Sequence, residues 1–289
     1  MAKRIDLHLV SDSTGETLES VTRASLARFE GVDAVKHFWP LVRSKGHLER
    51  VLTDIAKHPG LVLFTLASGE IRDHLEERCA AMHLPAVSAI DPVVAGMAAM
   101  LGKAATAAPG RQHRLDAAYF ARVEAINYTM AHDDGQSAES WNEADILLVG
   151  VSRTSKTPTS IYLANRGYKT ANLPLVPTRE PPPELFRLTK PFIVGLTTTP
   201  QRLVEVRRNR LLSLAQTPDT TYVDSERVRA EVAKARRMFA DQGWPVIDVT
   251  RKAIEETAAA ILNLMIPPED GELAAERTEK PGETSDECA

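Results

Sequence analysis

The stretch Ile146-Leu-Leu-Val-Gly150-Val-Ser-Arg-Thr-Ser-Lys156-Thr157 joins an apolar segment to a polar loop that ends in Lys-Thr. A glycine, four residues, a small residue and then Lys-Thr is the spacing of a phosphate-binding loop between a strand and a helix. In such loops backbone N–H groups surround phosphate oxygens, the lysine meets the β/γ end and the threonine hydroxyl ligates Mg²⁺. One position departs from the pattern, because Ser155 stands where a second glycine is usual. The stretch therefore predicts a nucleotide site in an α/β fold.

Segments on both sides of this stretch alternate between short apolar runs and helix-like patterns, which is typical of parallel sheets. Strands are predicted at residues 5–10, 35–42, 61–66, 86–90, 146–149, 171–176, 192–196 and 246–249. We therefore expect an N-terminal parallel-sheet α/β domain at 1–103 and a C-terminal P-loop kinase-like α/β domain at 141–266. Residues 104–140 are predicted to form a linker and a connecting helix. The acidic residues 267–289 are predicted to form a disordered tail.

Composition limits the class of protein. Hydrophobic residues make up 43% and charged residues 26% of the 289 residues, and no apolar run approaches the ~20 residues of a membrane span. The two cysteines, Cys79 and Cys288, lie far apart, which favours a reducing cytoplasm. Residues 267–289 hold eight acids and two basic residues, a net of −6, so the chain's net charge of −4 leaves +2 elsewhere. We expect neither a membrane nor a nucleic-acid partner.

Three carboxylates are candidates for the general base of a phosphoryl transfer. Asp12 follows the first predicted strand, and Asp248 is near the end of the last strand. Asp133 lies in a His-Asp-Asp-Gly run that could supply either a general base or a metal carboxylate. Each has an ordinary structural alternative. Ser13-Thr-Gly-Glu16 has the spacing of a helix capping box, Asp-Asp-Gly is a common turn, and Asp248 fits a helix cap. The sequence leaves the choice among the three open.

Basic and histidine residues add little by themselves. Arg207, Arg208 and Arg210 in a predicted helix fit either a lid that closes on a transferred phosphoryl group or a solvated basic face. The histidines outside the His-Asp-Asp-Gly run have no metal-ligand spacing, so no zinc site is predicted.

Several motifs together resemble one family. They are Ser11-Asp-Ser-Thr-Gly-Glu-Thr17, Glu124-Ala-Ile126 with His132-Asp-Asp-Gly135, Gly150–Ser160, and Ile247-Asp-Val-Thr250 with Ile254–Ala258. The chain resembles, over about residues 5–265, the bifunctional kinase/pyrophosphorylase family that regulates pyruvate, phosphate dikinase or phosphoenolpyruvate synthase. The resemblance implies that the protein uses ADP to phosphorylate a threonine of the target enzyme, and that this phosphorylation inactivates the enzyme. It also implies that inorganic phosphate removes this phosphate, releasing pyrophosphate and restoring activity.

The resemblance implies that the loop binds ADP through Gly150, Val151, Ser152, Arg153, Thr154, Ser155, Lys156 and Thr157. Within the loop we predict that Lys156 and Arg153 are catalytic, and that Thr157 holds Mg²⁺. Ser155, together with the Ser-Thr-Gly-Glu run and Asp-Val-Thr, looks like the branch whose protein substrate is pyruvate, phosphate dikinase.

Other interpretations stay open at this point. The target could be phosphoenolpyruvate synthase, the chain could be an ATP-dependent small-molecule kinase, or it could sense nucleotides without catalysis. The sequence also leaves open whether the chain forms a homodimer.

Overall fold

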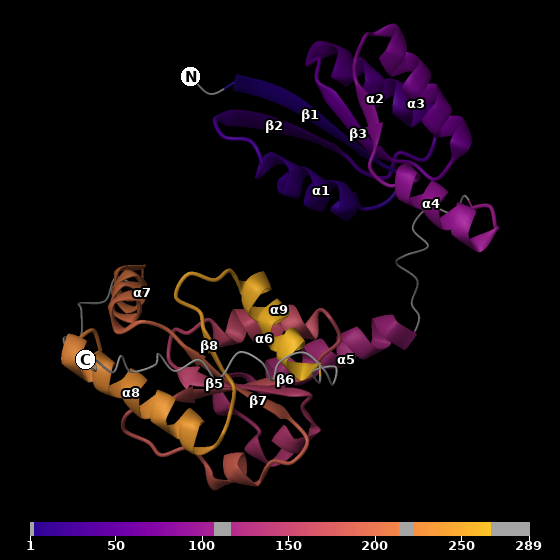
Figure 1. The fold of residues 1–289 in the computed structure, drawn as a ribbon. Helices are drawn as coiled ribbons and strands as arrows, with labels where there is room; N and C mark the ends of the chain where they lie inside the picture. The colour runs from indigo at the N-terminus through magenta and orange to yellow at the C-terminus, as the bar shows by residue number, and fades with distance from the viewer. Residues whose placement is uncertain (1–2, 107–116, 214–221, 267–289) are drawn as a thin grey trace, which may run out of the picture. The chain divides into compact units, whose positions relative to one another are not determined.

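The computed structural model describes residues 3–106, 117–213 and 222–266. The chain divides into two compact units, Met1–Arg114 and Leu115–Ala289, and each described part holds a four-stranded sheet of parallel strands (Figure 1). The expectation of an α/β protein with two parallel sheets is therefore confirmed. The predicted boundaries at residues 103 and 140 stay predictions, and residues 107–116 and the predicted acidic tail, 267–289, lie outside the described residues.

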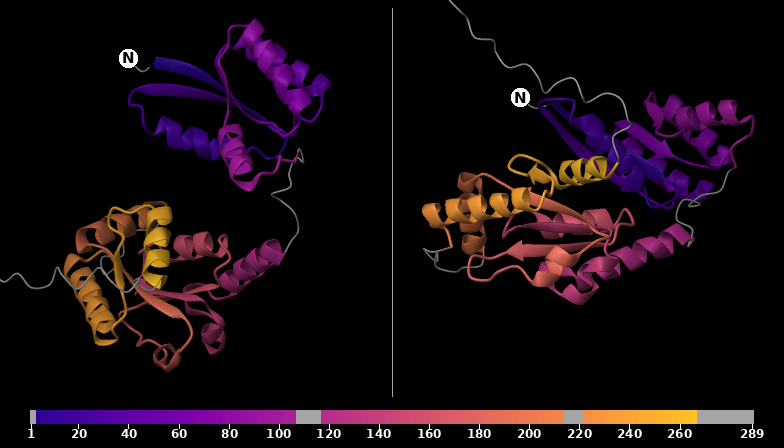
Figure 2. Two further views of the ribbon diagram at one scale, coloured as in Figure 1. Left: turned by 45° about the vertical axis from the view of Figure 1, so that its right-hand side comes forward. Right: turned by 60° about the horizontal axis from the view of Figure 1, so that its bottom comes forward.

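The first unit has the strand order β2-β1-β3-β4. Its strands are β1 (Lys3–Ser11), β2 (Val32–Trp39), β3 (Leu61–Thr65) and β4 (Ala86–Ser88). Its helices are α1 (Glu16–Leu26), α2 (Lys45–Lys57), α3 (Gly69–Ala81) and α4 (Asp91–Leu101). Figure 2 shows α2 and α3 side by side, and their apolar faces bury Leu52 and Leu75 with Phe64 of β3. Burial of such side chains contributes roughly 1.5–3 kcal/mol each.

The predicted capping box at the start of α1 is wrong. The residue before α1, in the N-cap position, is Gly15 rather than Ser13, and Gly15 has a left-handed φ of 79°. Ser13 instead accepts a bond from Leu41 N through its own carbonyl oxygen, and its N–H donates to Ser11 Oγ at 3.1 Å. Spacing alone cannot distinguish these arrangements, because the tertiary neighbour Leu41 decides where Ser13 points.

The second unit has the strand order β6-β5-β7-β8. Its strands are β5 (Ile146–Val151), β6 (Thr170–Leu175), β7 (Phe192–Thr197) and β8 (Val246–Asp248). Its helices are α5 (Ala117–Ala131), α6 (Lys156–Ala164), α7 (Pro200–Ser213), α8 (Ser225–Asp241) and α9 (Ile254–Met265), with short 3₁₀ helices η2 (Asp133–Gly135), η3 (Ala138–Glu143) and η4 (Pro183–Arg187).

The sheet of the second unit is covered on both faces. All six residues of β5 are buried, which explains its continuous apolar sequence. Leu147 and Val149 pack in one core with α8, whereas Ile146 and Leu148 pack in another with α6 and α9. This alternation follows from the period of two along a strand. In the part of the chain that the structure describes, no helix is both long and apolar enough to cross a membrane.

Candidate phosphate-binding site

The predicted phosphate loop lies at the carboxyl edge of the second sheet. β5 ends at Val151, residues 152–155 turn, and α6 begins at Lys156. The strand–loop–helix arrangement predicted from the sequence is therefore present. Open parallel sheets bind ligands at this edge, and the free N–H groups of a helix N-terminus favour anions there. The loop is thus placed where a phosphate group is best stabilised.

Gly150 is required by close packing. A Cβ at this position would lie 2.5 Å from the carbonyl oxygen of Leu196 in β7 and 2.8 Å from Thr154 Oγ1. Backbone in the middle of a sheet cannot move away cheaply, so a side chain at residue 150 would push the loop off its neighbouring strand. The glycine that begins the motif therefore sets how closely the loop approaches β7.

Hydrogen bonds inside the loop converge on one carbonyl oxygen. Thr154, fully buried, donates from Oγ1 to Val151 O at 3.0 Å, and Lys156 donates from Nζ to the same oxygen at 2.9 Å. The ammonium group of Lys156 is therefore folded back across the loop. It lies at the end of β5, where the terminal phosphoryl group of a bound nucleotide would meet it.

Ser155, which replaces the usual glycine of the motif, has a glycine-like backbone conformation. It has φ 58° and ψ 24°, the left-handed conformation that glycine adopts freely. Arg153 also has a positive φ, of 75°. Left-handed conformations of non-glycine residues cost of order 1–3 kcal/mol. The serine thus adopts the backbone conformation for which the usual glycine is suited, and the loop carries the strain.

Lys156 has an unusual electrostatic environment. Its side chain is 5% exposed, and burial lowers its pKa from the usual 10.5 to about 8. The carboxylates of Asp134 and Asp133 oppose this lowering of the pKa, whereas the positive charges of Arg153 and Arg207 add to it. The lysine is therefore an ammonium ion that is poorly solvated and gains from a phosphate partner.

Asp133 joins the loop through a threonine. Thr157 donates from Oγ1 to Asp133 Oδ1 at 2.9 Å, and Asn172 of β6 donates from Nδ2 to the same oxygen. Asn172 is fully buried, and its Oδ1 accepts from Asp134 N at 3.2 Å. Asn172 was not among the site residues predicted from the sequence. Its signal was a polar amide inside the apolar strand 170–175, where such residues are depleted.

The donors near Thr157 fit a magnesium ion. Within the described ranges, no group of three or more His, Cys, Asp or Glu side chains could hold a metal by itself. Mg²⁺ in nucleotide sites, however, takes one or two protein oxygens and completes its shell with phosphate and water. The hydroxyl of Thr157 and the carboxylate of Asp133 are oxygen donors of this kind, so the residues present fit the ion.

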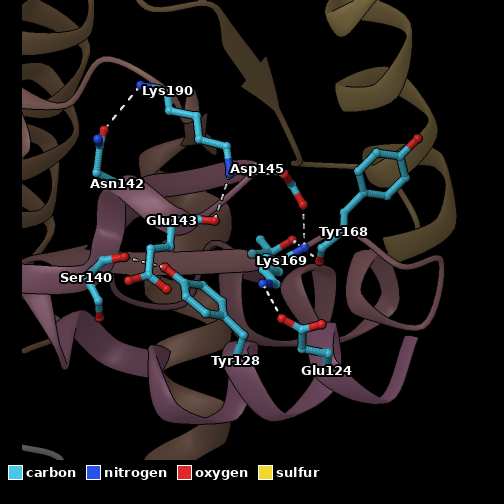
Figure 3. A network of polar contacts seen from close by, with 10 residues as sticks. Glu124, Tyr128, Ser140, Asn142, Glu143, Asp145, Tyr168, Lys169 and Lys190 are labelled. Carbon is cyan, nitrogen blue, oxygen red and sulfur yellow. Dashed lines mark hydrogen bonds and ion pairs between the residues drawn. The ribbon is translucent and has the colours of Figure 1, made fainter. Parts of the chain in front are cut away.

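Polar contacts join α5 to η3 and to the residues before β6 (Figure 3). Lys169 bonds Glu124 of α5 at 2.5 Å through Nζ, and its N–H donates to Asp145 Oδ2 at 2.9 Å. Tyr128 of α5 donates from its hydroxyl to Ser140 O at 3.0 Å. These contacts tie α5 and η3 to the start of β6. The turn between them, which contains Asp133, is consequently held in place.

His132 belongs to this scaffold and not to the reacting groups. Its Nδ1 donates to Tyr128 O at 2.6 Å, its Nε2 lies 2.6 Å from Ser140 Oγ, and its ring stacks on Tyr128 with centroids 3.7 Å apart. Both ring nitrogens are engaged, and the residue is buried. The histidine therefore fixes the end of α5 immediately before Asp133.

The other two candidate bases have structural partners. Asp12, in the first unit, accepts from Ala67 N at 2.6 Å and thereby ties the end of β1 to the segment after β3. Asp248 accepts from Thr250 N at 2.8 Å and from the Thr250 hydroxyl, and its Oδ2 lies 3.4 Å from Arg236. Of the three carboxylates, Asp133 is the one that accepts a hydrogen bond from a residue of the loop, Thr157.

Comparisons with known proteins identify the family of the chain. The kinase/pyrophosphorylase family model matches residues 7–262. This chain belongs to the kinase/pyrophosphorylase family. A protein of Rhizorhabdus wittichii is 66% identical over 262 residues, covering 91% of this chain and 96% of the relative. One of Sphingopyxis alaskensis is 63% identical, covering 91% and 97%. Both carry the provisional name pyruvate, phosphate dikinase regulatory protein.

In this member of the kinase/pyrophosphorylase family, the arginines of α7 divide into two groups. Arg207 is 2% exposed, forms an ion pair with Glu231 of α8 at 2.6 Å and lies over the ring of Tyr222. Its guanidinium group therefore joins α7 to α8. Arg208 and Arg210 are exposed. Sequence spacing placed the three arginines together, and only the packing of α8 separates them.

A cavity of about 450 Å³ adjoins the loop in this family member. Val151, Leu175 and Phe186 are among the apolar residues that line it, on the side of the sheet that α8 covers. An ion pair of 2.7 Å between Lys234 and Glu180 stands at its edge. Cavities of this size and apolar character are typical of ligand sites. Val151, which lines the cavity, is also the residue whose carbonyl oxygen accepts the Lys156 bond.

Proposed function

We propose that this protein regulates pyruvate, phosphate dikinase in the cytoplasm. It phosphorylates a dikinase threonine with ADP, which inactivates the enzyme, and removes that phosphate with inorganic phosphate, which restores activity. The observation that carries this proposal is the phosphate loop of Gly150–Thr157, with its buried lysine, in a chain of the kinase/pyrophosphorylase family. The relatives' provisional names supply the dikinase as target.

In the forward reaction the threonine hydroxyl attacks the β-phosphorus of ADP. The new O–P bond forms as the bond to AMP breaks, and the hydroxyl proton leaves to solvent or to a base. Backbone N–H groups of residues 152–157 and the ammonium group of Lys156 stabilise the charge on the transferring phosphoryl. Arg153, exposed on the loop, adds a second positive charge to this group. Mg²⁺ held at Thr157 would neutralise phosphate charge when bound.

In the reverse reaction inorganic phosphate occupies the anion site. Its oxygen attacks the phosphorus of the phosphothreonine, so that pyrophosphate forms and the threonine hydroxyl regains a proton. The same loop serves both directions, because free phosphate and the β-phosphate of ADP present the same oxygens to Lys156. One anion site with two occupants is thus sufficient for both activities.

The acceptor is best placed in the cavity beside Val151. The lysine of a phosphate loop meets the reacting end of the nucleotide, and Lys156 Nζ lies 2.9 Å from the carbonyl oxygen of Val151. A threonine delivered through this cavity would approach the end of β5, beside the carbonyl oxygen that Lys156 bonds. The apolar lining suits the flanking side chains of a polypeptide.

Labelled nucleotides test this function. The protein is incubated with ADP labelled in its β-phosphate or with γ-labelled ATP, alone, with purified dikinase, or with purified phosphoenolpyruvate synthase. We expect label on a dikinase threonine from β-labelled ADP alone, and release of labelled pyrophosphate when inorganic phosphate is added. Transfer only to phosphoenolpyruvate synthase, ATP turnover without a protein partner, or ADP binding without transfer would each support one of the alternatives instead.

A matched pair of lysine variants ties the activity to the loop. Lys156→Ala should lower both activities at least 100-fold, because it removes the positive charge at the reacting phosphoryl. Lys252→Ala is the control, since Lys252 is exposed and its side chain has no partner among the described residues. Full activity in Lys156→Ala would refute the assignment of the loop.

A further inference from the structure

We propose that Asp133, held by Asn172, is a positioning residue: it accepts the hydrogen bond of the Thr157 hydroxyl, so that the threonine oxygen presents its lone pairs to the cation of the nucleotide. This inference rests on the proposed function, because it concerns the metal that accompanies the bound nucleotide. It assigns a role to two residues outside the phosphate loop, one on η2 and one on β6.

The first step is the direction of the Thr157 bond. A threonine hydroxyl has one proton and two lone pairs, whereas an ionised carboxylate only accepts. In the contact of 2.9 Å between Thr157 Oγ1 and Asp133 Oδ1, the hydroxyl therefore donates its proton as a hydrogen bond to the aspartate. Both lone pairs of the hydroxyl oxygen are left for a cation. Without the carboxylate, a helical threonine turns its proton to the carbonyl oxygen three or four residues earlier.

The second step is the rigidity of the carboxylate. Asn172 donates from Nδ2 to Asp133 Oδ1, and its Oδ1 accepts from Asp134 N at 3.2 Å. The backbone N–H of Asn172 also donates to His132 O at 3.2 Å. One fully buried residue in the middle of β6 thus holds three consecutive residues of the turn. Asp133 cannot swing away from Thr157 without breaking buried hydrogen bonds, each worth roughly 1 kcal/mol.

Among the described residues of the second unit, no other carboxylate bonds the phosphate loop. In phosphate-loop enzymes an aspartate at the end of a neighbouring strand commonly helps to hold Mg²⁺. Here β7, which pairs with β5, ends in Leu196-Thr197 and continues through Thr198-Thr199. Asp248, at the end of β8, is bonded to Thr250 instead. In the described parts of the second unit, Asp133 is the carboxylate that bonds a residue of the loop, and its Oδ2 has no partner there.

The turn at residues 133–135 has an unusual backbone that accompanies the contact between Asp133 and Thr157. Asp134 has a left-handed φ of 51°, and Gly135 has φ 82°, where a Cβ would be strained and would lie 3.0 Å from Leu173 Cδ1. Strained backbone of this kind persists where surrounding contacts hold it. The strain brings the carboxylate of Asp133 back over the start of α6, while the side chain of Asp134 stays exposed.

The test separates metal-dependent from metal-independent nucleotide binding. Calorimetry measures the affinity of the full-length protein for ADP with Mg²⁺ and with EDTA. Asp133→Ala removes the acceptor of the Thr157 bond and should lose tenfold or more of the tightening that Mg²⁺ causes, the size usual for residues that orient metal ligands. Its affinity in EDTA should stay within about twofold of wild type. Asp134→Ala is the matched control and should keep the full effect of Mg²⁺.

A double substitution tests whether Asp133 acts through Thr157. In a Thr157→Val background, Asp133→Ala should cause no further loss of Mg²⁺-dependent tightening. Thr157→Ser, which keeps the hydroxyl, should keep this tightening. Asn172→Ala should reproduce the Asp133→Ala effect more weakly. Mn²⁺ paramagnetic resonance in the presence of ADP gives a second readout, in which the fraction of bound metal should fall in Asp133→Ala. Thermal unfolding identifies any variant that fails to fold.

Three results would overturn the inference. Equal weakening in Mg²⁺ and EDTA would mean that Asp133 only supports the fold of the loop. Full Mg²⁺ dependence with lost phosphoryl transfer would make it the general base. Additive losses in the double variant would remove the link through Thr157. If wild-type protein binds no ADP in either condition, the proposed function fails as well, which distinguishes that outcome from the other three.

Discussion

Proton uptake on nucleotide binding is the sharpest consequence of the buried lysine. In the free protein burial lowers the pKa of Lys156 to about 8, so at pH 8.5 only about a quarter of the molecules carry the ammonium form. A bound diphosphate, with negative charge beside Nζ, raises the pKa back toward 10 or above. Binding of ADP at pH 8.5 should therefore take up roughly three quarters of a proton.

The assay is calorimetry in two buffers with different ionisation enthalpies, whose difference in apparent binding enthalpy counts the protons. At pH 8.5 the phosphates of ADP are fully ionised, since their last pKa lies near 6, so the uptake reports the protein. At pH 7, where about nine tenths of the lysine is already protonated, its contribution should fall to about a tenth of a proton. The sign follows: ADP affinity falls as pH rises above about 8, approaching tenfold per pH unit.

Substitutions assign the proton. Lys156→Arg should show no uptake at pH 8.5, because a guanidinium group stays protonated, and any affinity it keeps should not fall between pH 7.5 and 9.5. Lys252→Arg, the exposed control, should behave as wild type. Uptake below about a tenth of a proton at pH 8.5 in the wild type would refute the argument from burial, because the lysine would then be fully charged before the nucleotide arrives.

Three further predictions concern the scaffold. Gly150→Ala should lower the free energy of unfolding by about 1–3 kcal/mol, measured by urea titration, because its Cβ would meet the backbone of β7 at 2.5 Å. Gly46→Ala, at a helical position with nothing within 4 Å, should instead raise it by about 0.4–1 kcal/mol, and a loss there would contradict the packing argument. Glu231→Gln should cost about 3–5 kcal/mol, since it leaves the charge of Arg207 buried without its partner; an unchanged thermal midpoint would mean that water reaches this pair. Ser155→Gly should keep ADP affinity within about threefold and should not destabilise the protein by more than about 1 kcal/mol, because glycine adopts the left-handed conformation without strain.

Local signals made much of the fold predictable. The apolar run before Gly150, the small polar loop and the Lys-Thr pair specify strand, turn and helix through contacts between near neighbours in the chain. The alternation of such units led to two parallel sheets, both of which the structure contains. Family motifs extended this to the activity. The boundaries of the predicted domains and the ADP site itself stay predictions.

Long-range partners made the rest unpredictable. The capping box at Ser13 failed because Leu41, far along the chain, bonds the carbonyl oxygen of that residue. Arg207 looked like its neighbours Arg208 and Arg210 until α8 placed Glu231 beside it. In each case the spacing was correct, and a residue from another element decided which side of the chain the group faces.

By itself, the sequence determined the strand, turn and helix around residues 150–157. The glycine, the small residues and the start of the helix that specify this backbone all lie within twelve consecutive positions. Only the tertiary structure decided which carboxylate is hydrogen-bonded to that loop. Asp133 and Thr157 are 24 residues apart, and Asn172 is 39 residues from Asp133. They meet because the pairing of β5 with β6 and the packing of α5 bring three separate segments to one sheet edge. A hydrogen bond of 2.9 Å between such segments is set by the whole unit's packing, which no local pattern encodes.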